Sequence, residues 1–135
     1  QQKRKASIES FKLKQPSVNM ESDEELISYD EAWLMEVADV VKKNVQDSDF
    51  KVPDLAYMLH VSERTLFNKL KSYTGLTPSE YMRKSRLDLA IHFIKARKFA
   101  TVKELSASVG IANTTHFATM FKKEYGVAPT KMLKA

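Results

Sequence analysis

The sequence predicts an all-α fold of about seven helices, with two helix-turn-helix subdomains joined by a long linker helix. Three observations lead to this prediction. Apolar residues beyond the first 28 positions recur with the period of a helix rather than that of a strand. Residues that favour helix starts and helix ends separate the periodic stretches. A helical hairpin is also written twice, the second copy 50 to 51 positions after the first.

The first helix is predicted over residues 29–45, because Ser28 and Glu31 have the spacing of a capping box and an apolar stripe follows them. Residues 1–28 mix basic, acidic and polar runs and follow no clear period. We therefore expect a flexible tail or interdomain linker over 1–28 and a single domain over 29–135.

The first helix-turn-helix is predicted over about 52–74. Pro53 suits the first turn of its short helix, where no backbone N–H is needed. Ser62 is a good N-cap for its longer helix, in which apolar residues recur every four positions. Gly75 is expected to end that longer helix.

The linker helix is predicted over about 78–97. Thr77 and Glu80 have capping-box spacing, and Pro78 stands at the first helical position. A helix of 20 residues is roughly 30 Å long. Successive major-groove faces on one side of B-DNA lie about 34 Å apart. A rigid spacer of this length can therefore set two recognition helices in adjacent major grooves.

The second helix-turn-helix is predicted over about 102–125. Thr101 and Glu104 repeat the capping-box spacing before its short helix. Either Asn113 or Thr114 is expected to cap its longer helix. This hairpin therefore has the same order of start signals as the first one.

The two hairpins also share the signals that follow them. Gly75 and Gly126 stand where the longer helix of each hairpin should end. Pro78 and Pro129 stand three residues later, where the next helix should begin. The first of these restarts opens the linker helix, and the second opens a short last helix.

The turn inside each hairpin needs a residue with a left-handed backbone, and this position falls on His60 and Gly110. His60 therefore has a structural explanation. No group of His and acidic residues has the spacing of metal ligands. We expect neither a metal site nor a cofactor.

Charge is divided unevenly along the chain. Residues 51–135 carry fifteen basic and six acidic side chains, a net charge of +9, whereas residues 16–50 have a net charge of −8. The helix-turn-helix region is therefore the candidate for binding a polyanion.

Several function classes lack the residues they need. The chain has no cysteine, which excludes disulfides and thiolate metal sites. No stretch approaches the ~20 apolar residues of a membrane span, so we expect no membrane contact by this domain. No paired carboxylates with a base and no Gly-rich phosphate loop are present. We expect that the protein is not an enzyme.

A helix-turn-helix presents its second helix to the major groove. Arg64 and Asn68 lie one turn apart and suit a guanine edge and an adenine edge. Basic residues farther along the two helices suit phosphates. The side chains expected to contact the DNA backbone are Ser62, Thr65, Lys69, Lys71, His116, Lys122 and Lys123.

Residues from Val52 to Lys134 resemble the DNA-binding domain of AraC/XylS-type bacterial transcription regulators. The resemblance is carried by LAYMLHVSERTLFNKLKSYTGLTPSEYMRKSRLDLA and by VKELSASVGIANTTHFATMFKKEYGVAPTKML. The segment FKKEYGVAP after a helix-turn-helix is a more specific signal than the helix-turn-helix alone.

This resemblance implies two helix-turn-helix subdomains on a long helix, binding to double-stranded promoter DNA, and recruitment or positioning of RNA polymerase. It also implies a cytoplasmic transcription factor whose sensor domain lies upstream in the same chain. The chain opens with Gln rather than Met, so we expect a piece of a longer regulator. The basic run QQKRK leaves open that this regulator is anchored in a membrane, with the present chain as its cytoplasmic part. The family's base-reading positions fall on Arg64, Phe67, Asn68, Thr114, Thr115, Ala118 and Thr119.

Two departures from the family pattern change the expectations. Members often carry Arg at the positions of Asn68 and Thr119, so we expect a different base preference, with adenine opposite Asn68. A Tyr-Arg pair is usual where this chain has Met132 and Leu133, and Lys131 replaces a capping Glu. We therefore expect the last helix to be less firmly docked.

An alternative from another class is a helical protein-interaction or RNA-binding module that uses the same basic surface. RNA readers usually expose aromatic stacking platforms. Here Trp33, Phe117 and Phe121 fall on core stripes, which favours DNA. The salt dependence of binding to duplex DNA separates the two hypotheses.

Overall fold

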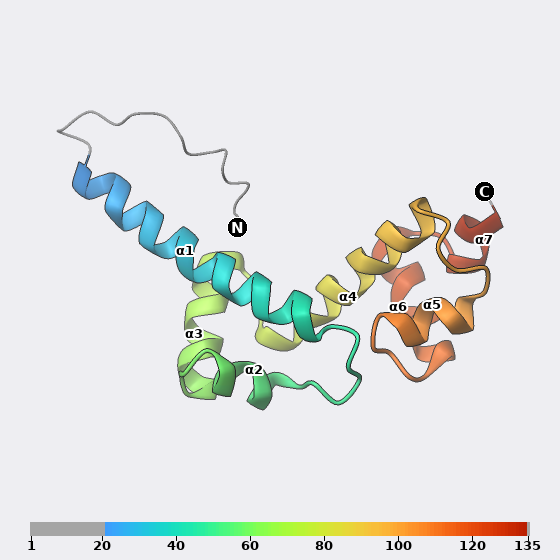
Figure 1. Cartoon of the computed structure of the whole chain (residues 1–135), viewed down its shortest axis with the longest axis horizontal. Coiled ribbons are helices and arrows are strands. Elements are labelled where there is room, and N and C mark those ends of the chain that lie inside the picture. The colour runs from blue at the N-terminus through green and yellow to red at the C-terminus, as the bar shows by residue number, and fades with distance from the viewer. Residues whose placement is uncertain (1–20, 135) are drawn as a thin grey trace. The chain divides into compact units, whose positions relative to one another are not determined.

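The computed structural model describes the backbone of residues 21–134 and the side chains of residues 29–134. The described residues form helices and turns without a strand, so the prediction of an all-α fold is confirmed. Figure 1 shows the helices in chain order. They are α1 (Glu21–Asn44), α2 (Val52–Met58), α3 (Glu63–Thr74), α4 (Pro78–Lys95), α5 (Val102–Ser108), α6 (Thr114–Tyr125) and α7 (Pro129–Lys134).

The chain divides into two compact units, residues 1–35 and 36–135. Of the described residues, the first unit holds the N-terminal part of α1. The second unit holds the rest of α1 and the six helices that follow. The packing described below lies within this second unit.

Helix α1 begins at Glu21, well before the predicted start at Tyr29. Because the helix runs through Ser28, no cap can form there, and the prediction that the helix begins at Tyr29 is wrong. The segment ESDEELIS contains no Gly or Pro and is rich in acidic residues, which stabilise the positive N-terminal end of a helix. The tail predicted over residues 1–20 lies outside the described part of the chain.

The first helix-turn-helix consists of α2 and α3, as predicted. Leu66 and Leu70 of α3 are completely buried. Helix α2 packs against α3, and Ala56 of α2 is buried. Val37 and Val41 from the C-terminal part of α1 are also buried.

The second helix-turn-helix consists of α5 and α6, again as predicted. Its core combines Leu105 with Phe117 and Phe121, and Leu87 and Ala90 of the linker helix α4 belong to the same buried cluster. The helix α4 contributes to both subdomains, because it packs against α3 as well as α5.

The last helix, α7, is docked on the second helix-turn-helix. It packs against α5 and α6, Pro129 is fully buried, and Met132 packs on the apolar cluster. A Met at this position fills apolar space that needs no polar partner, because its side chain is flexible.

The helix starts confirm most of the predicted caps. Ser62 Oγ accepts a hydrogen bond from Thr65 N at 3.0 Å, and Asn113 Oδ1 accepts one from His116 N at 2.9 Å. Asn113, rather than Thr114, is therefore the N-cap of α6.

The two predicted capping boxes differ. At α4 the box is complete, since Thr77 Oγ1 accepts from Glu80 N at 3.2 Å and Glu80 Oε1 accepts from Thr77 N at 2.9 Å. At α5 only the first half forms, since Thr101 Oγ1 accepts from Glu104 N at 3.1 Å. The Glu104 carboxylate turns instead to the backbone N–H of Ala100, at 3.3 Å.

The turns of the two hairpins have the left-handed backbone that was predicted. The φ angle is 60° at His60 and 81° at Gly110. Arg97, just after α4, also has a positive φ of 54°, which the sequence had not indicated. In the described part of the chain, no three His, Asp or Glu residues gather as metal ligands, and none of its helices is long and apolar enough to cross a bilayer.

Candidate nucleic-acid interface

The residues that α3 buries on one face determine which residues it exposes on the other. Because Leu66 and Leu70 anchor the helix in the core, Arg64, Asn68 and Lys71 point to solvent at a spacing of three or four residues. This exposed stripe presents a guanidinium, a carboxamide and an ammonium group in order along the helix.

Phe67 lies on the same exposed side of α3, with 45% of its surface accessible. A large apolar side chain gains nothing in free energy from this exposure. Its position among polar groups on a recognition helix suits contact with a thymine methyl group or a deoxyribose ring. The family resemblance had placed Phe67 among the base-reading residues, and this assignment stays a prediction.

Of the remaining candidates at α3, Ser62 and Thr65 are already used by the helix start. The Ser62 hydroxyl donates to Thr65 Oγ1 at 3.1 Å and accepts from the Thr65 amide. The Thr65 hydroxyl accepts that bond and keeps its own proton to donate. Lys71 is exposed, whereas Lys69 is partly buried, so Lys71 is the better placed of the two lysines to reach a phosphate.

Helix α6 repeats this arrangement with different chemistry. Phe117 and Phe121 are completely buried, which leaves Thr115 and Thr119 exposed one turn apart. The Thr119 hydroxyl donates to the carbonyl of Thr115 at 3.1 Å, so it presents lone pairs and a methyl group outward. Thr114 and Ala118, the other two base-reading candidates, are only partly exposed.

The basic residues of α6 stand in its first and last turns. His116 is exposed in the first turn, and Lys122 and Lys123 are exposed in the last turn. Their positions suit contacts with phosphates on either side of a groove.

The C-terminal end of α6 is held on α4 by a small polar network. The Tyr125 hydroxyl donates to Asp88 Oδ1 at 2.6 Å, and Lys84 Nζ lies 3.3 Å from Glu124 Oε2 and 3.7 Å from Asp88 Oδ1. Burial and the hydrogen bond to Asp88 both raise the pKa of Tyr125, so its phenol stays protonated and remains the donor. This network fixes the recognition helix against the linker.

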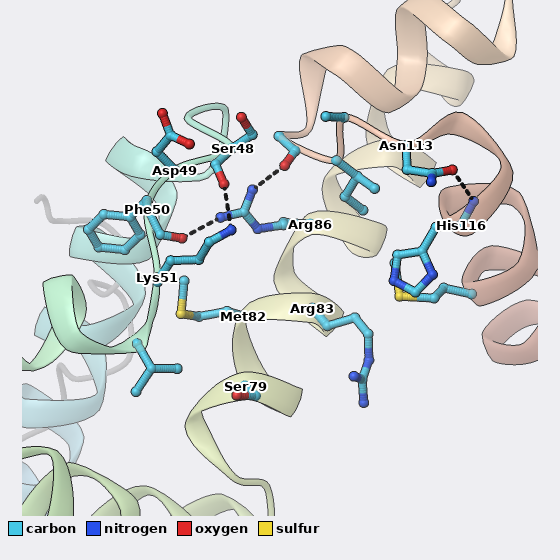
Figure 2. A pocket seen from close by; sticks show the side chains of 15 residues that line it. Ser48, Asp49, Phe50, Lys51, Ser79, Met82, Arg83, Arg86, Asn113 and His116 are labelled. Carbon is cyan, nitrogen blue, oxygen red and sulfur yellow. Dashed lines mark hydrogen bonds between the residues drawn. The ribbon is translucent and has the colours of Figure 1, made fainter.

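A hollow of about 470 Å³ lies between the loop that leads to α2, one face of α4, and the turn between α5 and α6. Figure 2 shows Lys51 from the loop, Arg83 from α4 and His116 from α6 around it. Sequence reasoning missed this hollow, because its walls come from segments that lie far apart in the chain.

The back of the hollow contains Arg86, which is only 8% exposed. Its guanidinium donates hydrogen bonds to backbone carbonyls of the loop and of the turn (Figure 2). Burial lowers the pKa of Arg86, and the nearby Asp47 carboxylate partly offsets this effect. Arg86 lies four residues after Met82 and four before Ala90, on the inner stripe of α4, so helical spacing could have identified it as buried.

Comparison with known proteins gives a consistent result. The family model described as "Helix-turn-helix domain" matches residues 55–135. A histidine kinase P4 from Formosa agariphila is 31% identical over 104 residues, which cover 77% of this chain and 8% of that protein. The HTH-type transcriptional activator RhaS from Escherichia fergusonii is 38% identical over 72 residues, which cover 53% of this chain and 26% of that protein. The chain thus spans only a small part of the length of these relatives.

A solved structure shows the same fold. The crystal structure of a transcriptional regulator from Chromobacterium violaceum, described as containing an AraC-type DNA-binding domain, aligns with a TM-score of 0.70 and 21% identity. The alignment covers 79% of this chain and 94% of that one. Because the family model matches more than half of the chain, the chain belongs to the AraC-type family of helix-turn-helix domains.

Proposed function

We propose that this domain binds double-stranded DNA in a sequence-specific manner and regulates transcription, with α3 and α6 as its two recognition helices. One observation carries the proposal: the fold presents two helices of the same length, each with a buried apolar face and an exposed polar face at matching positions. A helix-turn-helix offers this face of its second helix to the major groove.

The linker helix supports simultaneous binding to two adjacent major grooves. Helix α4 has 18 residues, which corresponds to about 27 Å. Both subdomains pack on it within a single compact unit. Adjacent major grooves on one face of B-DNA lie about 34 Å apart. A single chain can therefore read two elements about one turn apart, as other helix-turn-helix proteins do as dimers.

The exposed side chains divide into two proposed roles. Residues near the N-terminal and middle turns of the recognition helices read base edges: Arg64, Phe67, Asn68, Thr114, Thr115, Ala118 and Thr119. Residues at the helix starts and last turns position the duplex through its phosphates: Ser62, Thr65, Lys69, Lys71, His116, Lys122 and Lys123.

The domain is proposed to be the output part of a larger bacterial regulator. The relatives named above, a histidine kinase and a transcriptional activator, are far longer than the region they share with this chain. We infer an upstream sensor domain, action at promoters in the cytoplasm, and a contact with RNA polymerase.

The alternative of an RNA-binding or protein-interaction module has less support. The large exposed aromatic side chains are spread over α1 (Tyr29), α2 (Tyr57) and α3 (Phe67 and Tyr73), and the two on α3 stand six residues apart, a spacing that does not make them neighbours on one face. An RNA reader needs such rings close together, because successive bases stack on them.

A salt titration of duplex binding tests the proposal. Several phosphate contacts predict that the logarithm of the affinity falls steeply and linearly with the logarithm of the salt concentration. A single-stranded RNA of matched length is the control, and we expect it to bind more weakly at every salt concentration. Duplex binding that does not respond to salt would overturn the assignment of the basic surface to DNA.

A further inference from the structure

We propose that Arg86 is a positioning residue that fixes the spacing between the two recognition helices, and thereby the spacing between the two DNA elements that the chain reads. This inference rests on the proposed DNA-binding function. It is drawn from the hydrogen bonds of one buried guanidinium that joins the two subdomains.

On one side, Arg86 binds the segment that enters the first helix-turn-helix. Its Nη2 donates to the carbonyl of Phe50 at 3.0 Å and to that of Asp47 at 3.4 Å, and its Nη1 donates to the carbonyl of Val45 at 2.9 Å. These three carbonyls belong to the end of α1 and to the loop before α2.

On the other side, Arg86 binds the turn of the second helix-turn-helix. Its Nη1 donates to the carbonyl of Gly110 at 2.8 Å and to that of Val109 at 3.3 Å. Gly110 is itself a closely packed point, because a Cβ at this position would overlap both Arg86 Nη1 and the carbonyl oxygen of Val45. The turn and the end of α1 thus meet around the guanidinium.

The acceptors explain why a buried Arg is stable at this point without a carboxylate in contact. Val45 and Val109 stand at the C-terminal ends of α1 and α5, where backbone carbonyls lack partners within the helix and carry partial negative charge. A planar guanidinium can donate to several such carbonyls at once, whereas an ammonium group cannot match this geometry. One side chain therefore closes two helix ends from different subdomains.

Close packing does not join the loop and the turn on every side of Arg86, so the hydrogen bonds of Arg86 are needed to hold these two segments together. The hollow of about 470 Å³ separates the loop from the turn on the open side of Arg86 (Figure 2). Base pairs rise about 3.4 Å each along the duplex, so a displacement of a few ångströms between subdomains equals one base pair. Loss of Arg86 is therefore expected to relax the spacing that the protein accepts, without changing the residues that read bases.

The test compares Arg86→Met, which keeps the length and apolar stem of the side chain, with Arg83→Met. Arg83 lies one turn earlier on α4, is exposed and carries the same charge. Binding is measured to a duplex with the preferred two-element site and to duplexes with one base pair added or removed between the elements. For the natural chain we expect an affinity loss of about tenfold or more at the wrong spacing. For Arg86→Met we expect the loss to shrink to about threefold or less, and for Arg83→Met to stay unchanged.

A second measurement does not involve DNA. Because the chain has no cysteine, Tyr57→Cys in α2 and Lys103→Cys in α5 introduce two unique and exposed attachment sites for spin labels. The distance distribution between the labels should be narrow in the natural background and broader with Arg86→Met. Circular dichroism checks that each variant is folded. If Arg86→Met does not fold, Arg86→Lys replaces it in both measurements. We expect Arg86→Lys to broaden the distribution as well, because an ammonium group cannot hold both sides.

An unchanged distance distribution together with an unchanged spacing preference in a folded Arg86 variant would overturn the inference. A broadened distribution in a protein whose natural form binds no specific duplex would support the positioning role and reject the proposed function. The two proposals can therefore fail separately.

Discussion

The recognition helices α3 and α6 begin alike and then differ in what they expose. Both start at a capped residue and end at a left-handed Gly. Helix α3 presents the long donors Arg64 and Asn68, which can form two hydrogen bonds to one base edge. Helix α6 presents the short side chains Thr115 and Thr119 at the corresponding turns. We therefore expect the first subdomain to supply more of the base discrimination, and the second to supply more of the phosphate contact and fit.

The two subdomains also differ in the size of the buried side chains of their recognition helices, and here the second subdomain has the larger ones. The buried side chains of α3 are aliphatic, with Leu66 and Leu70 at the centre of the helix. In the second, the rings of Phe117 and Phe121 lie 5.7 Å apart and those of Phe121 and Tyr125 4.8 Å apart. The subdomain that we expect to discriminate less between bases therefore has the larger buried side chains in its recognition helix, which suits a part that holds a fixed shape.

The largest expected effect is on stability, for Phe117→Ala compared with Leu66→Ala. Both side chains are completely buried. Removing a buried Phe costs about 3–5 kcal/mol and removing a buried Leu about 2–5 kcal/mol, because transfer and cavity terms add. Urea unfolding of each variant should show the larger loss for Phe117→Ala. A larger loss for Leu66→Ala would contradict the view that the aromatic core is the stronger of the two.

The next largest effect compares Gly110→Ala with Gly126→Ala. Both positions have a φ of 81°, which costs a residue with a Cβ about 1–2 kcal/mol. A Cβ on Gly126 would meet nothing within 4 Å, whereas one on Gly110 would overlap Arg86 and the carbonyl of Val45. The free energy of unfolding should therefore fall at least about twice as much for Gly110→Ala. Equal losses would show that the turn and the end of α1 can separate at little cost.

Base discrimination is expected to separate Arg64→Ala from Thr115→Ala. Losing a bidentate donor costs about 1–3 kcal/mol at the base pair it reads. Thr115 has a single hydroxyl and a methyl group, so a smaller loss is expected at its position. Affinities for a panel of single-base variants of the preferred site measure both effects.

Lys122→Ala is the matched control for this panel, because it should weaken binding to all sequences about equally. The same uniform loss for Arg64→Ala would contradict the assignment of Arg64 to base reading. A larger sequence-dependent loss for Thr115→Ala than for Arg64→Ala would reverse the comparison between the two subdomains.

The smallest effect concerns the complete capping box of α4, which the last helix lacks. The backbone hydrogen bond from Thr77 holds the pKa of Glu80 below its usual value. Because the folded protein lowers this pKa, the contribution to stability is present above the unfolded value and is lost as pH falls through the folded one. The stability difference between the natural chain and Glu80→Gln should therefore be larger at neutral pH than at about pH 3. A difference that does not change with pH would contradict the proposed ionised cap.

Most of the features that were predicted correctly depend on interactions between residues close together in the chain. Caps such as Ser62 and the left-handed turn at His60 were predicted because they depend on residues within a few positions of each other. The start of α1 at Glu21 was missed because its first turns show no apolar period. Glu104 was expected to complete a capping box with Thr101. Its carboxylate instead accepts a hydrogen bond from the neighbouring backbone amide of Ala100. Residue spacing does not distinguish between these two local donors.

The hollow and its buried Arg86 could not be predicted in full. The inner stripe of α4 marks Arg86 as buried, but its partners are carbonyls that lie 23 to 41 positions away in the chain. Sequence patterns show which side chains turn inward, and they do not show which backbone groups will meet them. The exposed recognition faces were easier to predict, because they are what remains of each helix once its apolar stripe is assigned.

Competition between duplexes tests the proposed function most directly. Sites are first selected from random duplexes with the chain of residues 1–135, and the preferred duplex is then compared with a scrambled duplex of the same composition at about 0.15 M salt. We expect two elements about one helical turn apart and an affinity about 10³-fold or more above that for the scrambled duplex. Equal affinities for the two duplexes would contradict sequence-specific binding by α3 and α6.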